Sequence, residues 1–381
     1  MVNALTLAKV DYYLRPLLER VLPSRNFIQL YSATRNWYLD QLSSCRLDVT
    51  VPLRPVEFCG LTFRNDIINA AGLDKNGDLL EFNYLLGAGG AIIGTTLSHE
   101  NDGNAILVFN RHFNPWCPLP NSASAINSLN LPSKGIDYAV KNIRNFRSKF
   151  NPENFPIGVS VMYHPRAISN DAKLETLESC LKKALKIADF IEINESCPNT
   201  HTRNGQERHT HEGMKTRLER AVGIRNDHKG KYVPVFVKLR DFGNFENTIQ
   251  FFSEIGVDGL TDVNTQINYD QLIKKIDERD KSLFEYYYWH YKGGVSGEII
   301  KEFSYDQTKE AAEVIRKTGS SLKLMHVGGL ESVEDFNGSR KIDSEIVIVK
   351  QWLTGLMHCI GKERVDTIYK SRVENELHIS D

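Results

Sequence analysis

The sequence FIEINESCPNT, residues 190–200, indicates how this chain folds and where its chemistry lies. Residues 190–193 are mostly apolar with β-branched members, a composition typical of a short buried strand. The segment then leaves the strand with a thiol, Cys197, held extended by the ring of Pro198. A lone cysteine is most often a structural thiol, but here Asn194 and Asn199 bracket it with hydrogen-bonding amides. We interpret the segment as a chemical site at the C-terminal end of a strand.

Outward from this strand, short apolar runs alternate with longer amphipathic stretches. The strands that we expect are 67–71, 91–95, 157–162, 190–195, 235–239, 259–264, 323–327 and 345–350, and the helices between them include 174–187, 248–255 and 307–317. Eight β/α units predict an α/β fold, a closed (β/α)8 TIM barrel. An open doubly wound sheet should carry a Gly-rich dinucleotide loop, and no G-x-G-x-x-G is present.

Composition excludes several classes of protein. The chain has 381 residues, is 41% hydrophobic and 25% charged, and carries a formal net charge of -1. This balance does not favour nucleic-acid binding. The six cysteines show neither C-x-x-C pairs nor zinc spacing, which predicts reduced thiols and no metal. No run approaches the ~20 apolar residues of a membrane span.

Residues 1–50 differ from the barrel that we assign to residues 51–381. Apolar residues recur at helical spacing from Leu5 to Val21, interrupted by Pro16, and a second candidate helix carries Trp37 and Tyr38. This helical extension is either a hairpin packed on the barrel or an amphipathic element that lies on a membrane surface or frames a tunnel for an apolar molecule.

The ends of the expected strands bring polar residues and glycines to one face. In a TIM barrel, the catalytic and ligand-binding residues lie at the C-terminal ends of the strands. Gly328-Gly329 after the seventh strand and Lys350-Gln351 after the eighth stand where barrels often bind phosphate through backbone N–H groups.

These residues resemble the dihydroorotate dehydrogenase family over essentially the whole chain. The resemblance rests on residues 59–65, on Ala-Ala-Gly-Leu-Asp-Lys-Asn-Gly at 70–77, and on Asn194-x-Ser196-Cys197-Pro198-Asn199. It implies FMN as cofactor, dihydroorotate as substrate and orotate as product, in pyrimidine (UMP) biosynthesis. Cys197 would be the catalytic base, and Lys238 would stabilise negative charge on reduced flavin.

The site residues that follow fall into two groups. The predicted cofactor contacts are Ala71, Gly72, Thr95, Asn194, Lys238, Asn264, Ser296, Gly297, Gly328, Gly329, Lys350 and Gln351. The predicted substrate contacts are Lys75, Asn127, Asn194, Asn199, Asn264 and Thr265.

Features of two family branches are mixed. The N-terminal helices resemble the quinone-using, membrane-associated branch, whereas Cys197 resembles the soluble branch. Ser160 replaces a usual asparagine, and the segment after Asn104 lacks the arginine of the family's quinone tunnel. We expect a peripheral membrane protein, on the inner face of a cell membrane or the mitochondrial inner membrane and otherwise cytoplasmic. Its acceptor would be a quinone, with fumarate or NAD as alternatives. Another pyrimidine-like substrate, or a non-catalytic paralogue, remains open.

Overall fold

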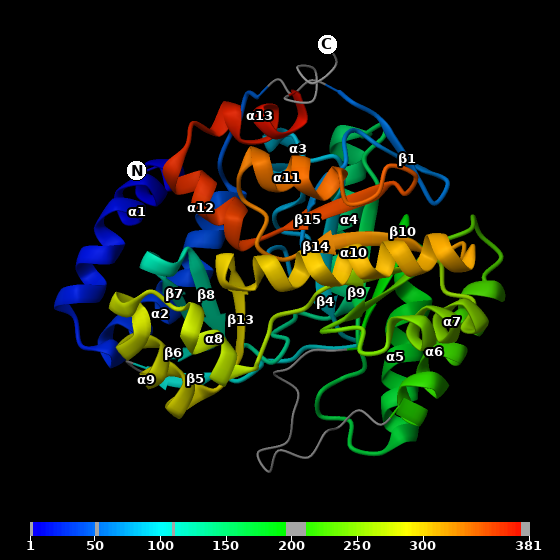
Figure 1. Ribbon diagram of the computed structural model, residues 1–381, viewed down its shortest axis with the longest axis horizontal. Helices are drawn as coiled ribbons and strands as arrows, with labels where there is room; N and C mark the ends of the chain where they lie inside the picture. The colour runs from blue at the N-terminus through cyan, green and yellow to red at the C-terminus, as the bar shows by residue number, and fades with distance from the viewer. Residues whose placement is uncertain (1–2, 50–52, 109–110, 196–210, 375–381) are drawn as a thin grey trace.

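Eight parallel strands form the centre of the computed structural model, in the order β3-β15-β14-β12-β11-β10-β9-β4. The structure describes residues 3–49, 53–108, 111–195 and 211–374. The barrel strands are β3 (Ile67–Asn69), β4 (Ala91–Thr96), β9 (Ile157–Val161), β10 (Phe190–Asn194), β11 (Val235–Leu239), β12 (Gly259–Asp262), β14 (Lys323–Val327) and β15 (Ile348–Trp352). The prediction of a TIM barrel with a helical extension is confirmed (Figure 1).

Helices cover the outside of the barrel. They are α3 (Leu80–Leu86), α4 (Ile136–Phe150), α5 (Asn170–Ala184), α6 (His211–Asn226), α7 (Phe245–Ile255), α10 (Lys301–Thr318), α11 (Val333–Arg340), α12 (Thr354–Lys362) and α13 (Ile368–Glu374). Several begin at a side chain that caps the first turn. Asn244 accepts from the amide of Asn247 at 2.9 Å, and Ser332 forms a capping box with Asp335.

Nearly all residues of the barrel strands are buried. One face of each strand points into the barrel interior, and the surrounding helices cover the other face. At the N-terminal end, aromatic rings fill the interior. Phe58 and Phe63 come from the hairpin β1 (Val56–Phe58) and β2 (Leu61–Phe63), and they meet Phe190 and Phe236 of the strands. Fully burying each ring contributes about 1.5–3 kcal/mol. This end of the barrel is therefore closed, and a ligand site is left to the opposite end.

Where β3 and β4 meet, a side chain makes hydrogen bonds that the backbone of a neighbouring strand would otherwise make. Asn69 donates from Nδ2 to the carbonyl of Ile92 at 2.7 Å, and its Oδ1 accepts from the Ile92 amide at 3.2 Å. Backbone bonds from Gly89 to Ile67 and from Gly72 to Gly94 flank this contact. One buried amide thus completes the hydrogen bonding around the barrel.

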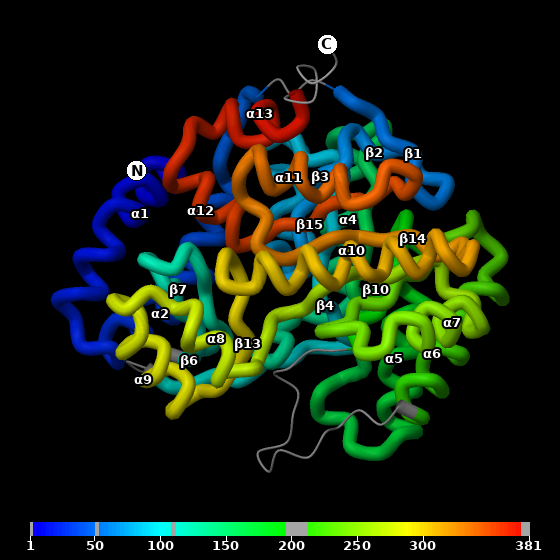
Figure 2. The backbone as a smooth tube through the Cα atoms, viewed as in Figure 1, coloured from blue at the N-terminus to red at the C-terminus, as the bar shows by residue number. Residues whose placement is uncertain are grey.

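Elements outside the barrel gather over its C-terminal end. A three-stranded sheet has the order β13 (Gly294–Gly297), β8 (Ser124–Asn127), β7 (Trp116–Leu119). Beside it lie the hairpin β5 (Ile106–Val108) and β6 (Arg111–Phe113), and the helices α8 (Tyr269–Lys275) and α9 (Lys281–Tyr291). Figure 2 shows that this layer lies next to the N-terminal helices and away from α13.

The N-terminal helices are α1 (Ala4–Val21) and α2 (Ser24–Ser43). Contrary to the sequence prediction, α1 continues through Pro16. Proline disrupts helices, but α1 is held on both sides of it: Ala4 and Ala8 are buried in the main core, and Leu18 packs on the cluster under α2. Helix α1 packs closely on α12 at Gly361, which has no side chain. A Cβ added to Gly361 would lie 2.8 Å from the Tyr12 Cβ. Within the described residues, no helix is long and apolar enough to cross a membrane.

Candidate active site

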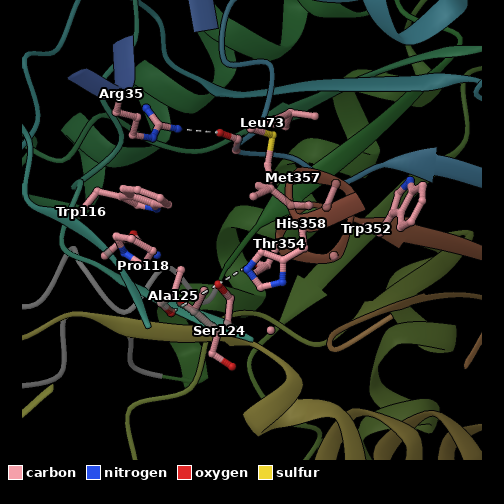
Figure 3. A pocket seen from close by; sticks show the side chains of 18 of the residues that line it. Arg35, Leu73, Trp116, Pro118, Ser124, Ala125, Trp352, Thr354, Met357 and His358 are labelled. Atoms are coloured by element: carbon pink, nitrogen blue, oxygen red, sulfur yellow. Dashed lines mark hydrogen bonds between the residues drawn. The ribbon is translucent and has the colours of Figure 1, made fainter. Parts of the chain in front are cut away.

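A cavity of about 420 Å³ lies between the C-terminal ends of the barrel strands and the N-terminal helices. The strand ends, the sheet of β7, β8 and β13, and helices α1, α2 and α12 all contribute to its walls. Figure 3 shows Arg35 of α2 and Trp116 of β7 on one side, with Thr354 and Met357 of α12 opposite them. Small-molecule sites in proteins occupy this range of volumes.

Nearly every predicted site residue in the described part of the chain lines this cavity. They are Ala71, Gly72, Lys75, Thr95, Asn127, Asn194, Lys238, Asn264, Thr265, Ser296, Gly297, Gly328, Gly329 and Gln351. The exception is Lys350. The structure thus brings together residues that are up to 280 positions apart in the sequence.

A chain of amides and hydroxyls crosses the floor of the cavity. Asn194 donates to Thr95 Oγ1 at 2.8 Å and its Oδ1 accepts from Asn264 at 3.2 Å. The Asn264 Oδ1 accepts in turn from the Thr265 amide at 2.8 Å, and Ser160 bonds Thr95 at 3.2 Å. These contacts fix which way each amide faces. The floor can therefore present ordered donors and acceptors to a planar ligand with amide and carboxylate edges.

Two lysines bring positive charge to this floor. Lys238 is buried on β11, whose register places it beside Asn194. Lys75 follows Asp74, whose carboxylate accepts from the amides of Gly77 at 2.7 Å and Leu79 at 3.0 Å. Burial, helped by the charge of Asp78, raises the pKa of Asp74 to about 7. Asp74 thereby shapes the loop that holds Lys75 at the cavity.

The turn after β14, Gly328-Gly329, is held in place by a side chain of α10. Gly328 and Gly329 both have positive φ, at 136° and 71°, a conformation that glycine adopts readily. Ser304 donates to the Gly328 carbonyl at 2.7 Å and bonds His326 at 3.2 Å. Burial lowers the pKa of His326 to about 3, with a smaller contribution from the charge of Lys350, so the imidazole is neutral. The turn can therefore present its N–H groups without a nearby histidine charge.

The eighth strand corrects the prediction for Lys350. The expected strand was 345–350, but β15 runs from Ile348 to Trp352, so Lys350 lies within it. Its Nζ bonds Asp66 at 2.7 Å, on the outside of the barrel beside Arg340. Burial lowers the pKa of Lys350 to about 8, against the opposing effect of Asp66.

Beyond the end of β15, the cavity is lined by Thr354, the first residue of α12. Its Oγ1 bonds Ser296 Oγ at 2.9 Å, and helix N-termini attract phosphate. Sequence reasoning missed Thr354 because it ended the strand too early. Gln351 does line the cavity, and its Nε2 donates to Glu192 at 3.2 Å inside the barrel.

The helical wall of the cavity is apolar with a few polar groups. Ser32 of α2 both donates to and accepts from the backbone of Trp116 at 3.0 Å, which ties α2 to β7. Asp11 accepts from Tyr31 at 2.6 Å and from Arg15 Nε at 3.0 Å. Arg35 extends from α2 toward Gly72 (Figure 3). The sequence contains these residues but gives no signal that separates Arg35 from the other arginines of the extension.

Cys197 and Asn199, the predicted base and a substrate contact, lie outside the described residues. The residue before this segment, Glu195, is buried and paired with Arg217 of α6, whose Nε bonds it at 2.9 Å. In the described part of the chain, no group of His, Cys, Asp or Glu side chains could hold a metal ion.

Comparison with known proteins gives the family. The family model for dihydroorotate dehydrogenase matches residues 54–338. The chain belongs to the dihydroorotate dehydrogenase family. The match begins after the N-terminal helices and includes every barrel strand except β15.

Curated dihydroorotate dehydrogenases (quinone) are similar over most of their length. The protein of Pseudoalteromonas atlantica is 25% identical over 323 residues, with 83% of this chain and 87% of the relative covered. That of Idiomarina loihiensis is 26% identical over 341 residues, covering 88% and 93%. The crystal structure of DHODH from Eimeria tenella in complex with ferulenol superposes with a TM-score of 0.70 at 20% identity, covering 97% of this chain and 99% of that one. At that identity, the last match supports the fold alone.

The residues at the cavity fit the flavin that a dihydroorotate dehydrogenase would use. Asn194, Asn264 and Lys238 bring amide and ammonium donors to the cavity beside the backbone of Gly72 and Gly328. This donor set suits the carbonyl edge of an isoalloxazine ring, and the lysine suits the negative charge of its reduced form. The Gly328-Gly329 turn and the N-terminus of α12 suit its phosphate.

Proposed function

We propose that this protein oxidises dihydroorotate to orotate in pyrimidine biosynthesis, with FMN as cofactor and a quinone as electron acceptor. The observation that carries the proposal is the cavity itself, where the polar floor of Asn194, Asn264 and Lys238 faces an apolar wall from α1 and α2. One cavity then serves a polar substrate from one side and an apolar acceptor from the other.

Substrate binding rests on the amides and on Lys75. Asn127, Asn194, Asn264 and Thr265 would hold the amide edges of the ring, and the Lys75 ammonium would pair with the carboxylate. Cys197, by resemblance to the family, would remove the proton at carbon. FMN, when bound, accepts the hydride from the neighbouring carbon.

The residues of this chain would hold FMN in a fixed place. The Gly328-Gly329 turn and Thr354 would bind the phosphate, and Ser296 would orient Thr354 through their 2.9 Å contact. Lys238 would stabilise the negative charge that reduction brings to the ring. The chain would have two domains. Residues 1–50 would form an extension that binds the acceptor and contacts the membrane, and residues 51–381 would form the barrel that binds the cofactor.

Membrane contact is supported by the outer face of the helices. Tyr13, Leu17 and Trp37 are 70%, 54% and 52% exposed, and Val10, Leu14 and Val21 accompany them. Apolar and aromatic residues on an outward helical face favour peripheral binding at the headgroup boundary. The proposed location is therefore the inner face of a cell membrane or of the mitochondrial inner membrane.

The activity is tested by the colour of the protein. Anaerobic addition of dihydroorotate should bleach the flavin absorption of the purified protein. Cys197→Ala should keep its flavin and lose roughly 10²–10⁴-fold in the bleaching rate, the usual scale for a positioned acid–base group. Lys238→Ala should release flavin or slow its reduction sharply. A yellow protein that dihydroorotate leaves unbleached would indicate another substrate, and a colourless one a non-catalytic paralogue.

Membrane contact is tested separately from activity. Tyr13→Glu combined with Leu17→Glu should abolish co-sedimentation with anionic phospholipid vesicles and leave dihydroorotate bleaching unchanged, because neither residue lines the cavity. The control is Ile168→Glu, because Ile168 is 92% exposed but lies in the β9–α5 connection of the barrel. Equal vesicle binding by both proteins would contradict the assignment.

A further inference from the structure

Arg35 is a cation in the apolar wall of the cavity. It lies on α2, where its guanidinium meets the carbonyl of Gly72 at 3.4 Å and the side chain of Asn36 at 3.3 Å. Both distances are at the long limit for hydrogen bonds from nitrogen. A guanidinium offers five N–H donors, so these contacts leave most of its capacity unused.

The other arginine at this wall is satisfied differently. Arg15 pairs with the carboxylate of Asp11, and its charge is neutralised there. Arg35 has no carboxylate partner among the described residues. Burial lowers the pKa of Arg35 to about 10, so the group still carries its charge at neutral pH. A half-buried charge without a counterion is unfavourable unless something else satisfies it.

The surroundings indicate what kind of molecule could satisfy Arg35. Leu73, Trp116 and Met357 line the cavity with Arg35, and Figure 3 shows Arg35 on the same side as Trp116 and facing Met357. A ligand here must be mostly apolar and flat enough to lie beside Trp116. It must also carry an oxygen acceptor for the guanidinium. A carbonyl on an apolar ring meets both conditions.

We propose that Arg35 is the residue that holds the electron acceptor, donating hydrogen bonds to one carbonyl oxygen of a quinone in the cavity. This inference rests on the proposed function and names the acceptor-specific residue of that site. The segment directly after Asn104, residues 105–108, contains no arginine. The guanidinium of Arg35 comes from α2, which Ser32 ties to β7 on the same side of the cavity.

The position next to Gly72 places Arg35 beside the proposed flavin site. In the net reaction dihydroorotate loses two electrons and two protons to become orotate, and the quinone gains two of each to become a hydroquinone. Negative charge builds on the quinone oxygen as the electrons arrive, before its protons do. A fixed guanidinium stabilises that charge through charge-assisted hydrogen bonds.

The test uses holoenzyme and a short-chain ubiquinone as the probe. Arg35→Gln removes the charge, Arg35→Lys keeps it without the planar fork, and Arg25→Gln makes the same change at an exposed arginine on the same helix. Loss of a hydrogen bond to a charged group predicts an increase of about tenfold to a hundredfold in quinone KM for Arg35→Gln. Arg35→Lys should recover part of this loss, and Arg25→Gln should match the wild type.

Three measurements distinguish an error in the role of Arg35 from an error in the proposed function: flavin bleaching, the quinone KM and the quinone Kd. Flavin bleaching by dihydroorotate should be unchanged in all variants, and the quinone Kd, measured by calorimetry with oxidised holoenzyme, should rise in parallel with KM. An unchanged quinone KM and Kd in Arg35→Gln, with wild-type turnover of quinone, would overturn the role of Arg35 alone. If the wild type is bleached by dihydroorotate but never reoxidised by quinone, the acceptor in the proposed function is wrong and this inference falls with it. Loss of bleaching in Arg35→Gln would mean that Arg35 supports the flavin site instead.

Discussion

Replacing Asn69 by leucine should destabilise the barrel, because its amide serves the backbone of another strand. The side chain is fully buried and makes both hydrogen bonds to Ile92, at 2.7 and 3.2 Å. Leucine has the same branched arrangement of heavy atoms but would leave one buried N–H and one buried C=O without partners. Each orphaned group costs about 1–3 kcal/mol, while the added apolar burial returns about 1–2 kcal/mol. The two groups together cost about 2–6 kcal/mol, so we expect Asn69→Leu to lower the free energy of unfolding by about 2–3 kcal/mol, the middle of the net range.

Asn83 provides the matched control. It is also fully buried, but neither atom of its amide has a hydrogen-bond partner in the described structure. The same substitution, Asn83→Leu, should be neutral or stabilising because no bond is lost and a buried polar group is removed. Urea unfolding followed by circular dichroism measures both variants against the wild type. Equal effects of Asn69→Leu and Asn83→Leu would refute the role of Asn69 where β3 and β4 meet.

Three further predictions concern groups behind the cavity. His326 has a folded pKa of about 3, below its unfolded value of about 6.5, so its contribution to stability is complete above pH ~6.5 and is lost as the pH falls toward 3. His326→Asn should flatten acid unfolding over that range, and parallel curves would contradict this. Lys350 has a folded pKa of about 8, so wild type should gain stability relative to Lys350→Met between pH 8 and about 10.5, where urea unfolding measures the difference. Ser304→Ala removes the bond to the Gly328 carbonyl and should weaken FMN binding several-fold, as measured by flavin fluorescence, while Ser148→Ala on exposed α4 should not.

The barrel could be predicted from sequence because each of its strands is a local apolar run. The strands β11 and β14 have the predicted bounds, since charged or turn residues flank both runs. The eighth strand was misplaced because residues 345–349 are as apolar as the true strand. Its position depends on pairing with β3, about 280 residues earlier, and on the burial of Lys350 by Asp66. Neither partner is visible in a local pattern.

The site was predictable where motifs mark strand ends, and not where distant elements meet. Asn194 and Lys238 lie at the ends of recognisable strands, Gly328 directly follows one, and all three reach the cavity as expected. Arg35 does not, because helical spacing alone does not tell which of several arginines faces the barrel. The pairing of β8 with β13, which brings Asn127 and Ser296 to one site, joins segments about 170 residues apart. It depends on a sheet that only the folded chain defines.

The absent side chain at Gly361 has a consequence for engineering the protein. The closest approach of the N-terminal helices to the barrel is set there, since a Cβ would lie 2.8 Å from the Tyr12 Cβ and 3.0 Å from the Ala8 carbonyl. Gly361 also lines the cavity. A graded series of alanine, serine and valine at this position would act as a wedge of increasing thickness between α1 and α12. Such a series adjusts the width of the route into the protein without changing any group that binds FMN or dihydroorotate, and gives a single position at which to select for bulkier or slimmer oxidants.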